Sequence, residues 1–284
     1  MNRREFLKDT GTFAIGSLLV TSVLHDHFSG LPLKKIKNPG LQLYTVRKEM
    51  LADARGTLRR LANLGVKQIE SARSDKGNYY GLTAKEMKQV CNELGMTLRS
   101  GHVHLDTQWQ QTMSEAVEAG QEYLVCSSMP TQGQTADNYK KVAAAFNKAG
   151  EECKRLGLKF GYHNHDYEFE QENGQVLYDV LLENTDAGLV HMELDLGWVI
   201  AAGKDPLDYF TKYPGRFPLW HLKDMDLQKK KSTEFGKGSL DIAEMLRHRK
   251  QSGLKYFFVE QEEYTTTPLE SIQYNMDYLA RLKI

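Results

Sequence analysis

An alternation of two patterns limits most strongly what this chain can fold into. From Leu41 onward, short β-branched or apolar runs alternate with helical patterns of about 10 to 20 residues, and glycines mark the helix ends. We count eight such units, with predicted strands at 41–46, 66–71, 96–104, 123–129, 158–165, 189–196, 217–223 and 256–260. Connections of this length join parallel strands, and eight of them in about 245 residues favour a closed barrel. The sequence therefore predicts a single (β/α)8 TIM barrel.

An open, doubly wound sheet is the main alternative for a chain with this alternation. Such a sheet binds a dinucleotide at a glycine-rich turn after its first strand. The residues at that place are Tyr44, Thr45, Val46 and Arg47, so the glycine-rich turn is absent from the sequence. This absence favours the barrel.

The charge balance argues against a nucleic-acid partner. The sequence has 37 Lys and Arg residues against 37 Asp and Glu residues, and a net charge of zero. A protein without a net field needs a local basic patch to hold a polyanion. The basic run Lys229-Lys230-Lys231 reads as a solvated loop, so we expect no nucleic-acid binding.

The first 30 residues have the pattern of an export signal. A paired arginine, Arg3-Arg4, is followed by an uncharged stretch at 10–24, which resembles a twin-arginine signal. The apolar run of about 15 residues is short for a membrane span, which needs about 20. We expect residues 1–30 to be a signal segment, residues 31–284 to be the barrel domain, and the protein to be periplasmic. No stable membrane insertion is expected after signal removal, and a membrane anchor is the alternative if the signal stays uncleaved.

Metal-capable side chains stand at the carboxyl ends of four neighbouring predicted strands. The active sites of (β/α)8 barrels lie at these ends and in the loops that follow them. Mixed imidazole and carboxylate groups suit Mn²⁺, Co²⁺, Zn²⁺ or Fe²⁺ better than Ca²⁺. The side chains belong to His163, His165, Glu193, Asp195, His221 and Glu260. We therefore predict a divalent metal ion as cofactor, with Mn²⁺ preferred and Co²⁺, Zn²⁺, Fe²⁺ or Mg²⁺ as alternatives.

A metal held by two histidines and two carboxylates can leave positions open for neighbouring oxygens of a substrate and polarise a carbonyl group. Chemistry of this kind is typical of sugars. Lys223 lies two residues after His221, on the same side of the predicted strand, and could neutralise an alkoxide or enolate oxygen. A solvated loop lysine is the alternative for Lys223.

Five segments together resemble the xylose isomerase-like barrel superfamily. They are LQLYTVR at 41–47, YHNHD at 162–166, ELDLGW at 193–198, HLKD at 221–224 and GKG at 236–238. Members of this superfamily are known as sugar phosphate isomerases/epimerases and include ketose 3-epimerases, inosose dehydratases and abasic-site endonucleases. The resemblance extends over about residues 38–282 and implies a shared barrel and metal site, while the substrate differs between members.

The resemblance implies that the metal ligands are His163, Asp195, His221 and Glu260. Epimerases of this group usually carry Glu where this chain has His163, so one of the two acids that exchange a proton on opposite faces of a ketose is missing. Relatives often have His where this chain has Trp198, which places an aromatic platform there. The site therefore suits proton abstraction next to a carbonyl better than symmetric 3-epimerisation.

We expect an isomerase or epimerase that acts on a non-phosphorylated carbohydrate through a metal-stabilised enediolate. The expected partner is this small-molecule substrate, and the chain could form an oligomer. A lyase or dehydratase that eliminates a β-leaving group from a keto-sugar or keto-glycoside is one alternative, and a non-catalytic carbohydrate-binding barrel is another. The expected catalytic residues are Glu260, His165 and Lys223, and the expected substrate contacts are Glu70, His102, Trp198 and Lys223.

The loop Gly236-Lys237-Gly238 follows the seventh predicted strand, where some barrels bind phosphate. A flexible turn before the next helix explains the two glycines equally well. Export argues against a phosphorylated substrate. The sequence alone leaves both a phosphate site and a simple turn open.

Overall fold

Eight parallel strands close into a barrel in the computed structural model, which describes residues 36–284. Parallel pairing of β1 with β12 completes the ring, and the predicted (β/α)8 fold is confirmed. The predicted signal segment, 1–30, lies outside the described residues. The barrel strands are β1 (Gly40–Gln42), β2 (Gln68–Ala72), β3 (Thr97–Val103), β4 (Tyr123–Cys126), β5 (Lys159–His163), β8 (Val190–Asp195), β9 (Leu219–Leu222) and β12 (Tyr256–Val259).

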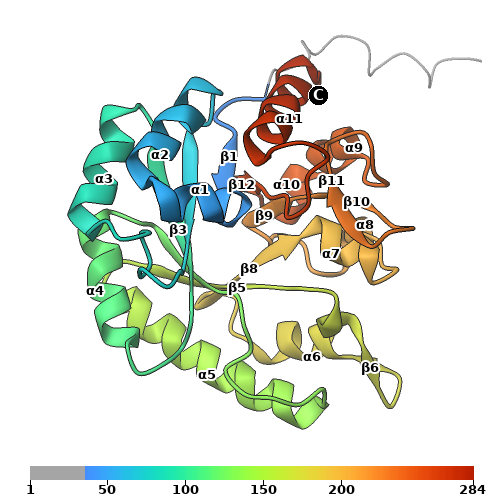
Figure 1. Cartoon of the computed structure of the whole chain (residues 1–284). Helices are drawn as coiled ribbons and strands as arrows, with labels where there is room; N and C mark the ends of the chain where they lie inside the picture. Colours follow the sequence, from blue (N-terminus) through green and yellow to red (C-terminus); the bar gives the residue numbers. More distant parts are fainter. Residues whose placement is uncertain (1–35) are drawn as a thin grey trace, which may run out of the picture. The chain divides into compact units, whose positions relative to one another are not determined.

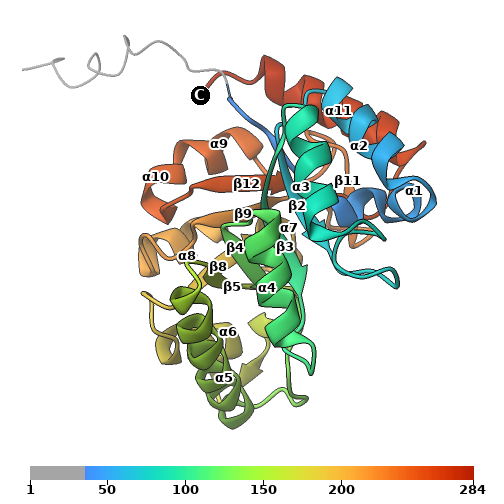
Figure 2. The ribbon, with the colours of Figure 1, turned by 90° about the vertical axis from the view of Figure 1, so that its left-hand side faces the viewer.

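Helices surround this barrel, and Figures 1 and 2 show α2 to α5 following one another along its outside. Capping boxes at Thr83 and Thr267 start α3 and α11, and Gly120 ends α4 in a left-handed conformation. Across residues 36–284, no helix is long and apolar enough to cross a membrane. The helices are α1 (Arg47–Ala52), α2 (Ala54–Asn63), α3 (Ala84–Glu93), α4 (Trp109–Ala119), α5 (Ala136–Arg155), α6 (Leu177–Asn184), α7 (Leu196–Ala201), α8 (Pro206–Lys212), α9 (Ile242–Arg247), α10 (Arg249–Ser252) and α11 (Pro268–Arg281).

Three local features differ from the sequence prediction. The first strand does not run to Val46, because the Gln42 side chain accepts the N–H of Tyr44 and starts the 3-10 helix η1 (Leu43–Val46). A short hairpin, β6 (Gln171–Glu172) with β7 (Gln175–Val176), turns at Asn173 and Gly174, both of which have positive φ. A second hairpin, β10 (Asp224–Asp226) with β11 (Lys231–Thr233), follows β9.

The interior of the barrel has an apolar layer below a polar one. Tyr123, Val125, Leu219 and Phe258 form a buried cluster separate from the main core. Successive strand residues point to opposite faces, so Leu219 and Phe258 share the inner face with the polar residues two positions after them, His221 and Glu260. The apolar cluster therefore fills the barrel towards the amino ends of the strands, and the polar residues lie towards the carboxyl ends.

The loop after β9 is organised by Asp224. Its carboxylate accepts backbone N–H groups from Met225, Gly236, Gly238 and Leu240 at 2.9 to 3.0 Å. A Cβ at Gly238 would lie 2.2 Å from Asp224 Oδ1, so the close approach requires glycine. The N–H groups of Gly236 and Gly238 are thus bonded to a protein carboxylate, which favours the turn interpretation of this loop over a phosphate site.

Replacing Asp224 by Ala is expected to lower the free energy of unfolding by about 3 kcal/mol, because four buried or part-buried N–H groups lose a charged acceptor. Urea unfolding monitored by circular dichroism measures this change. The exposed residue Asp137 provides a control, since Asp137→Ala should stay within about 0.5 kcal/mol of the parent. A loss below 1 kcal/mol for Asp224→Ala would contradict the proposed role of this carboxylate.

Candidate metal centre

Four side chains at the carboxyl end of the barrel converge on one point. His163 ends β5, Asp195 ends β8, His221 lies in β9, and Glu260 follows β12. One potential ligand atom from each lies within 4.8 Å of the others, and all four residues are buried. His163 Nε2 is 3.3 Å from Asp195 Oδ2, and His221 Nδ1 is 2.9 Å from Glu260 Oε2. The structure therefore brings together the four residues expected as metal ligands.

Asp195 is held by its neighbours so that one oxygen faces this cluster. Its backbone N–H donates to Asn164 Oδ1 at 3.0 Å. Its Oδ1 accepts the N–H of Trp198 at the start of α7 at 2.9 Å, which leaves Oδ2 towards His163. The N-terminus of a helix favours a negative charge, so α7 stabilises Asp195 as a carboxylate.

A second polar layer lies beneath these four residues. Glu70 accepts hydrogen bonds from Gln42 Nε2 at 2.8 Å and from the Ser100 hydroxyl, and lies 2.7 Å from His221 Nε2. His102 Nε2 is 2.8 Å from Glu193 Oε2. Glu70 has no exposed surface. The predicted substrate contacts Glu70 and His102 are thus both held by protein groups; Glu70 is completely buried and His102 is 8 % exposed.

Sequence reasoning counted Glu193 among the metal-capable side chains but gave it no role in the site, and it missed Gln42 and Ser100. The signal for Glu193 was available, because it lies two residues before Asp195 on the same strand and so faces the same side. Burial raises the pKa of Glu70 to about 7, with the Glu193 carboxylate adding to the effect, and burial also raises the pKa of Glu193 to about 7. Burial therefore disfavours the charged form of these two carboxylates, Glu70 and Glu193.

The histidines differ in their protonation. Burial, reinforced by the nearby His221, holds the pKa of His163 well below its usual value, so its ring is neutral, the form that binds a metal. Burial also lowers the pKa of His102 to about 4. Burial works to lower the pKa of His221 as well, but the carboxylates of Glu193 and Glu260 outweigh it and raise that pKa well above its usual value.

The donor set and its charge fit a divalent cation. Four carboxylates, those of Glu70, Glu193, Asp195 and Glu260, lie in the two layers at 0 to 5 % exposure. Two atoms, His163 Nδ1 and Glu193 Oε1, are buried without a hydrogen-bond partner. Glu70 contacts His221 through Nε2, as a carboxylate does when it fixes the ring of a metal-binding histidine, while Nδ1 lies 2.9 Å from Glu260 Oε2 within the cluster. Imidazole and carboxylate ligands suit the Mn²⁺, Zn²⁺ and Fe²⁺ group.

Lys223 is the cationic side chain nearest to the cluster. It is completely buried, and its Nζ lies 3.0 Å from Asp195 Oδ2, 2.8 Å from Glu260 Oε2 and 2.8 Å from Glu262 Oε1. Burial works to lower its pKa, but the carboxylates of Asp195 and Glu260 outweigh it and raise that pKa well above its usual value. The alternative of a solvated loop lysine is therefore wrong.

Aromatic side chains border the open side of the cluster. The ring of Trp198 lies 4.7 Å from Lys223 Nζ and 6.2 Å from the ring of His165. His165 in turn stacks on Tyr167 at 5.3 Å. Both His165 and Trp198 are part-exposed. The structure thus places these two predicted site residues next to the cluster, on the side that solvent reaches.

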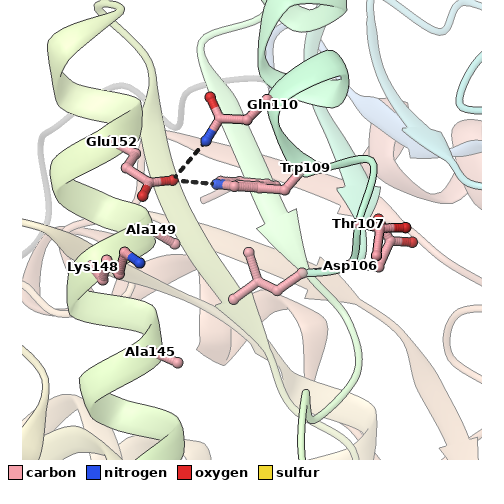
Figure 3. Close-up of a pocket in the computed structure, with 9 residues that line it drawn as sticks. Asp106, Thr107, Trp109, Gln110, Ala145, Lys148, Ala149 and Glu152 are labelled. Carbon is pink, nitrogen blue, oxygen red and sulfur yellow. Dashed lines mark hydrogen bonds between the residues drawn. The ribbon is translucent and has the colours of Figure 1, made fainter.

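A separate pocket lies outside the barrel, between the β3–α4 loop, α4 and α5 (Figure 3). Trp109 Nε1 donates to Glu152 Oε2 at 2.8 Å, and Gln110 Nε2 donates to the same oxygen at 3.3 Å. These bonds link α4 to α5. The pocket lining contains no group of the metal-capable cluster, so it is distinct from the candidate metal centre.

Comparison with known proteins matches residues 58–282 to the family described as xylose isomerase-like TIM barrel. The chain belongs to this family. Its match covers every barrel strand after β1 and therefore includes all four residues of the candidate metal centre. The predicted resemblance is confirmed at the level of family and fold.

Relatives with curated descriptions carry the name inosose dehydratase. The protein from Clostridium perfringens (strain 13 / Type A) is 32 % identical over 111 residues, which cover 39 % of this chain and 36 % of the relative. The protein from Clostridium tetani (strain Massachusetts / E88) is 28 % identical over 156 residues, which cover 48 % of this chain and 52 % of the relative. The matched regions thus span about a third to a half of the curated relatives.

Solved structures of the same fold cover nearly all of the barrel. A sugar phosphate isomerase/epimerase from Parabacteroides distasonis ATCC 8503 is 27 % identical with a TM-score of 0.77, covering 86 % of this chain and 98 % of that one. The zinc-bound IolI protein is 16 % identical with a TM-score of 0.69, covering 84 % and 95 %. At this lower identity the likeness concerns the fold alone.

Proposed function

We propose that this xylose isomerase-like barrel is a divalent-metal-dependent enzyme that removes a proton next to the carbonyl of a keto-sugar, keto-glycoside or related cyclic polyol ketone and then expels a β-leaving group. The observation that carries the proposal is the buried convergence of His163, Asp195, His221 and Glu260 at the carboxyl end of the barrel. A divalent cation bound there would supply Lewis-acid polarisation of a carbonyl oxygen.

Glu260 is suited to take the proton. Its Oε2 contacts His221 and Lys223, while among the described residues no hydrogen bond occupies its Oε1. Burial works to raise the pKa of Glu260, but the charges of Lys223 and His221 outweigh it and hold that pKa well below its usual range. The group is therefore a carboxylate with one oxygen free of hydrogen bonds among the described residues, and the ionised form is the one that a general base needs.

His165 is suited to protonate the leaving group from another side. Two strands, β8 and β9, separate β5 from β12 on the shorter way around the barrel, so His165 and Glu260 approach a substrate from different directions. In the proposed reaction Glu260 takes the α-proton and the C–H electron pair forms an enolate. The enolate then restores the carbonyl, a C=C bond forms, the bond to the leaving group breaks, and His165 supplies that group with a proton.

Elimination is favoured over epimerisation by the unequal character of these two groups. Exchange of one proton on opposite faces of a ketose uses a matched pair of acids, whereas the two candidate groups here are a carboxylate, Glu260, and an imidazole, His165, and Glu70 and Glu193 have no exposed surface. The similarity to relatives named inosose dehydratase also supports elimination. An isomerase or epimerase of non-phosphorylated carbohydrate remains the second candidate, supported by the sugar phosphate isomerase/epimerase likeness.

The experiment that separates these candidates follows the carbon-bound proton in deuterated water. The Mn²⁺-loaded protein is incubated with a panel of ketoses, inososes and keto-glycosides, and products are followed by NMR. Release of water or an aglycone with formation of a C=C bond supports the lyase, and a new epimer without release supports the epimerase. If no panel member exchanges a carbon-bound proton, the enolisation proposal fails and a carbohydrate-binding barrel becomes the better description.

Glu70→Gln is expected to weaken Mn²⁺ binding by 10- to 100-fold, because Glu70 holds His221 through Nε2 and such supporting carboxylates contribute this much to metal affinity. Isothermal titration calorimetry measures the change. The exposed Glu151→Gln removes the same charge on the outer face of α5 and should leave affinity unchanged. If the parent, Glu70→Gln and Glu151→Gln bind Mn²⁺ with equal affinity, Glu70 does not support the metal centre.

Export is also proposed, on the twin-arginine-like pattern around Arg3 and Arg4. A fusion of residues 1–35 to a reporter that functions only after twin-arginine export tests it, with Arg3→Lys and Arg4→Lys together as the control. Periplasmic activity of the parent fusion that is lost in the control supports export. Equal activity of both fusions would contradict it.

A further inference from the structure

Lys223 contacts two different kinds of carboxylate. Asp195 Oδ2 at 3.0 Å and Glu260 Oε2 at 2.8 Å belong to the candidate metal centre, and these are the oxygens nearest to His163 and His221. The third partner, Glu262 Oε1 at 2.8 Å, belongs to the loop after β12 and lies outside the group of metal-capable residues. The ammonium group of Lys223 therefore joins the metal centre to an acid beside it.

An ammonium group and a divalent cation compete for the same two oxygens. A metal ion binds carboxylate oxygens at about 2.0 to 2.2 Å. Lys223 Nζ, at 3.0 Å or less from both oxygens, would then lie next to a doubly charged ion with little solvent to screen the repulsion. Binding of the metal requires that Lys223 give up at least one of these contacts.

The surroundings of Lys223 offer a second place for its charge. Glu262 is 28 % exposed, so it lies towards the open side of the barrel, whereas Asp195 is completely buried. The ring of Trp198, 4.7 Å from Nζ, adds a surface that attracts a cation. The backbone of Gly197 packs closely against the aliphatic part of Lys223, since a Cβ at Gly197 would lie 2.8 Å from Lys223 Cγ. Movement of this side chain is therefore expected mainly at its ammonium end.

We propose that Lys223 is a positioning residue that neutralises Asp195 and Glu260 in the metal-free protein and, when the metal binds, gives up these two contacts while it keeps those with Glu262 and Trp198. The inference rests on the metal centre of the proposed function. Glu262 acquires a role of its own, because it stabilises Lys223 in the displaced position and so favours uptake of the metal. The pair Lys223 and Glu262 would set how tightly the metal is held.

The test measures Mn²⁺ affinity in a double-mutant cycle by isothermal titration calorimetry. We expect Lys223→Met to bind Mn²⁺ at least tenfold more tightly than the parent, and Glu262→Gln to bind it at least threefold more weakly. In the Lys223→Met background the Glu262→Gln change should have little effect, because Glu262 acts through Lys223. Lys229→Met removes an exposed lysine of the same charge and should leave the affinity unchanged.

Thermal unfolding gives a second readout. Without metal, Lys223→Met should have a lower Tm than the parent because two buried carboxylates lose their partner, and added Mn²⁺ should raise its Tm by more than it raises that of the parent. Mere damage to the site would weaken metal binding, so tighter binding distinguishes displacement from a structural role.

Each contrary result is informative. Unchanged or weaker Mn²⁺ binding by Lys223→Met would overturn the inference while leaving the metal centre intact. If Lys223→Met does not fold, Glu262→Gln is compared with Glu151→Gln, which removes an equal charge from an exposed side chain of α5. Equal effects of these two changes on Mn²⁺ affinity would overturn the inference. If the parent binds no Mn²⁺, Zn²⁺, Co²⁺ or Fe²⁺, the proposed function fails first.

Discussion

Replacing Glu260 by Gln is expected to lower kcat for α-proton exchange by about 10³-fold, the central range for removal of a general acid or base. Gln keeps the shape of the side chain but cannot accept the proton, and the change also removes a charge that balances Lys223 and His221. The rate is measured by NMR as deuterium incorporation into the keto substrate, at Mn²⁺ concentrations high enough to saturate both proteins.

Saturation with metal is the essential condition of this measurement, because Glu260 is also an expected ligand. If activity returns to the parent rate once the metal site is full, then Glu260 serves as a ligand only and another group takes the proton. His165→Asn, tested in parallel, should reduce product release more than deuterium exchange if His165 acts on the leaving group.

His163→Ala is expected to weaken Mn²⁺ binding by more than 100-fold. The side chain is 2 % exposed, its ring is neutral, and its Nδ1 has no hydrogen-bond partner, so the change removes a buried ligand from the cluster. Bound metal is measured by elemental analysis after gel filtration and by calorimetry. His221→Ala should give a similar loss and, because it also breaks the contact to Glu70, a lower Tm.

The control for these two variants is His248→Ala, which removes an exposed histidine that pairs with Glu244 at the surface. Its metal content should equal that of the parent. Full retention of metal by His163→Ala and His221→Ala would show that the four-residue cluster is not the metal centre, whatever the activity of the protein.

The alternation of strands and helices was sufficient to predict the barrel, because each strand carries its own local signal. The same reasoning located His163, Asp195, His221 and Glu260 in one place, since parallel strands end at the same side of a sheet. It failed for the segment after Gln42, where a side chain accepting the N–H of Tyr44 ends the strand early. A contact of this kind depends on one rotamer, which a pattern of apolar residues does not contain.

The lower polar layer could not be assembled from sequence, because its contacts cross the barrel. Glu70 and His221 are 151 residues apart, and the pairing of strands sets which side chains share a level. His163 pairs with Glu193 in the register of β5 and β8, whereas Asp195 pairs with His221 in that of β8 and β9. Because of this difference in register, His221 contacts residues of both polar layers. No local pattern in the sequence predicts the register.

The apolar cluster of Tyr123, Val125, Leu219 and Phe258 has a consequence for the order of events in turnover. Within residues 36–284 it fills the barrel beneath the polar layers, so substrate is expected to reach the site from the carboxyl ends of the strands. In an elimination, one substrate molecule becomes two products, and both have to leave by the way the substrate arrived. In the proposed mechanism His165, on the side that solvent reaches, protonates the departing group, so we expect that group to leave first and the unsaturated ketone to be the product that inhibits binding of the next substrate.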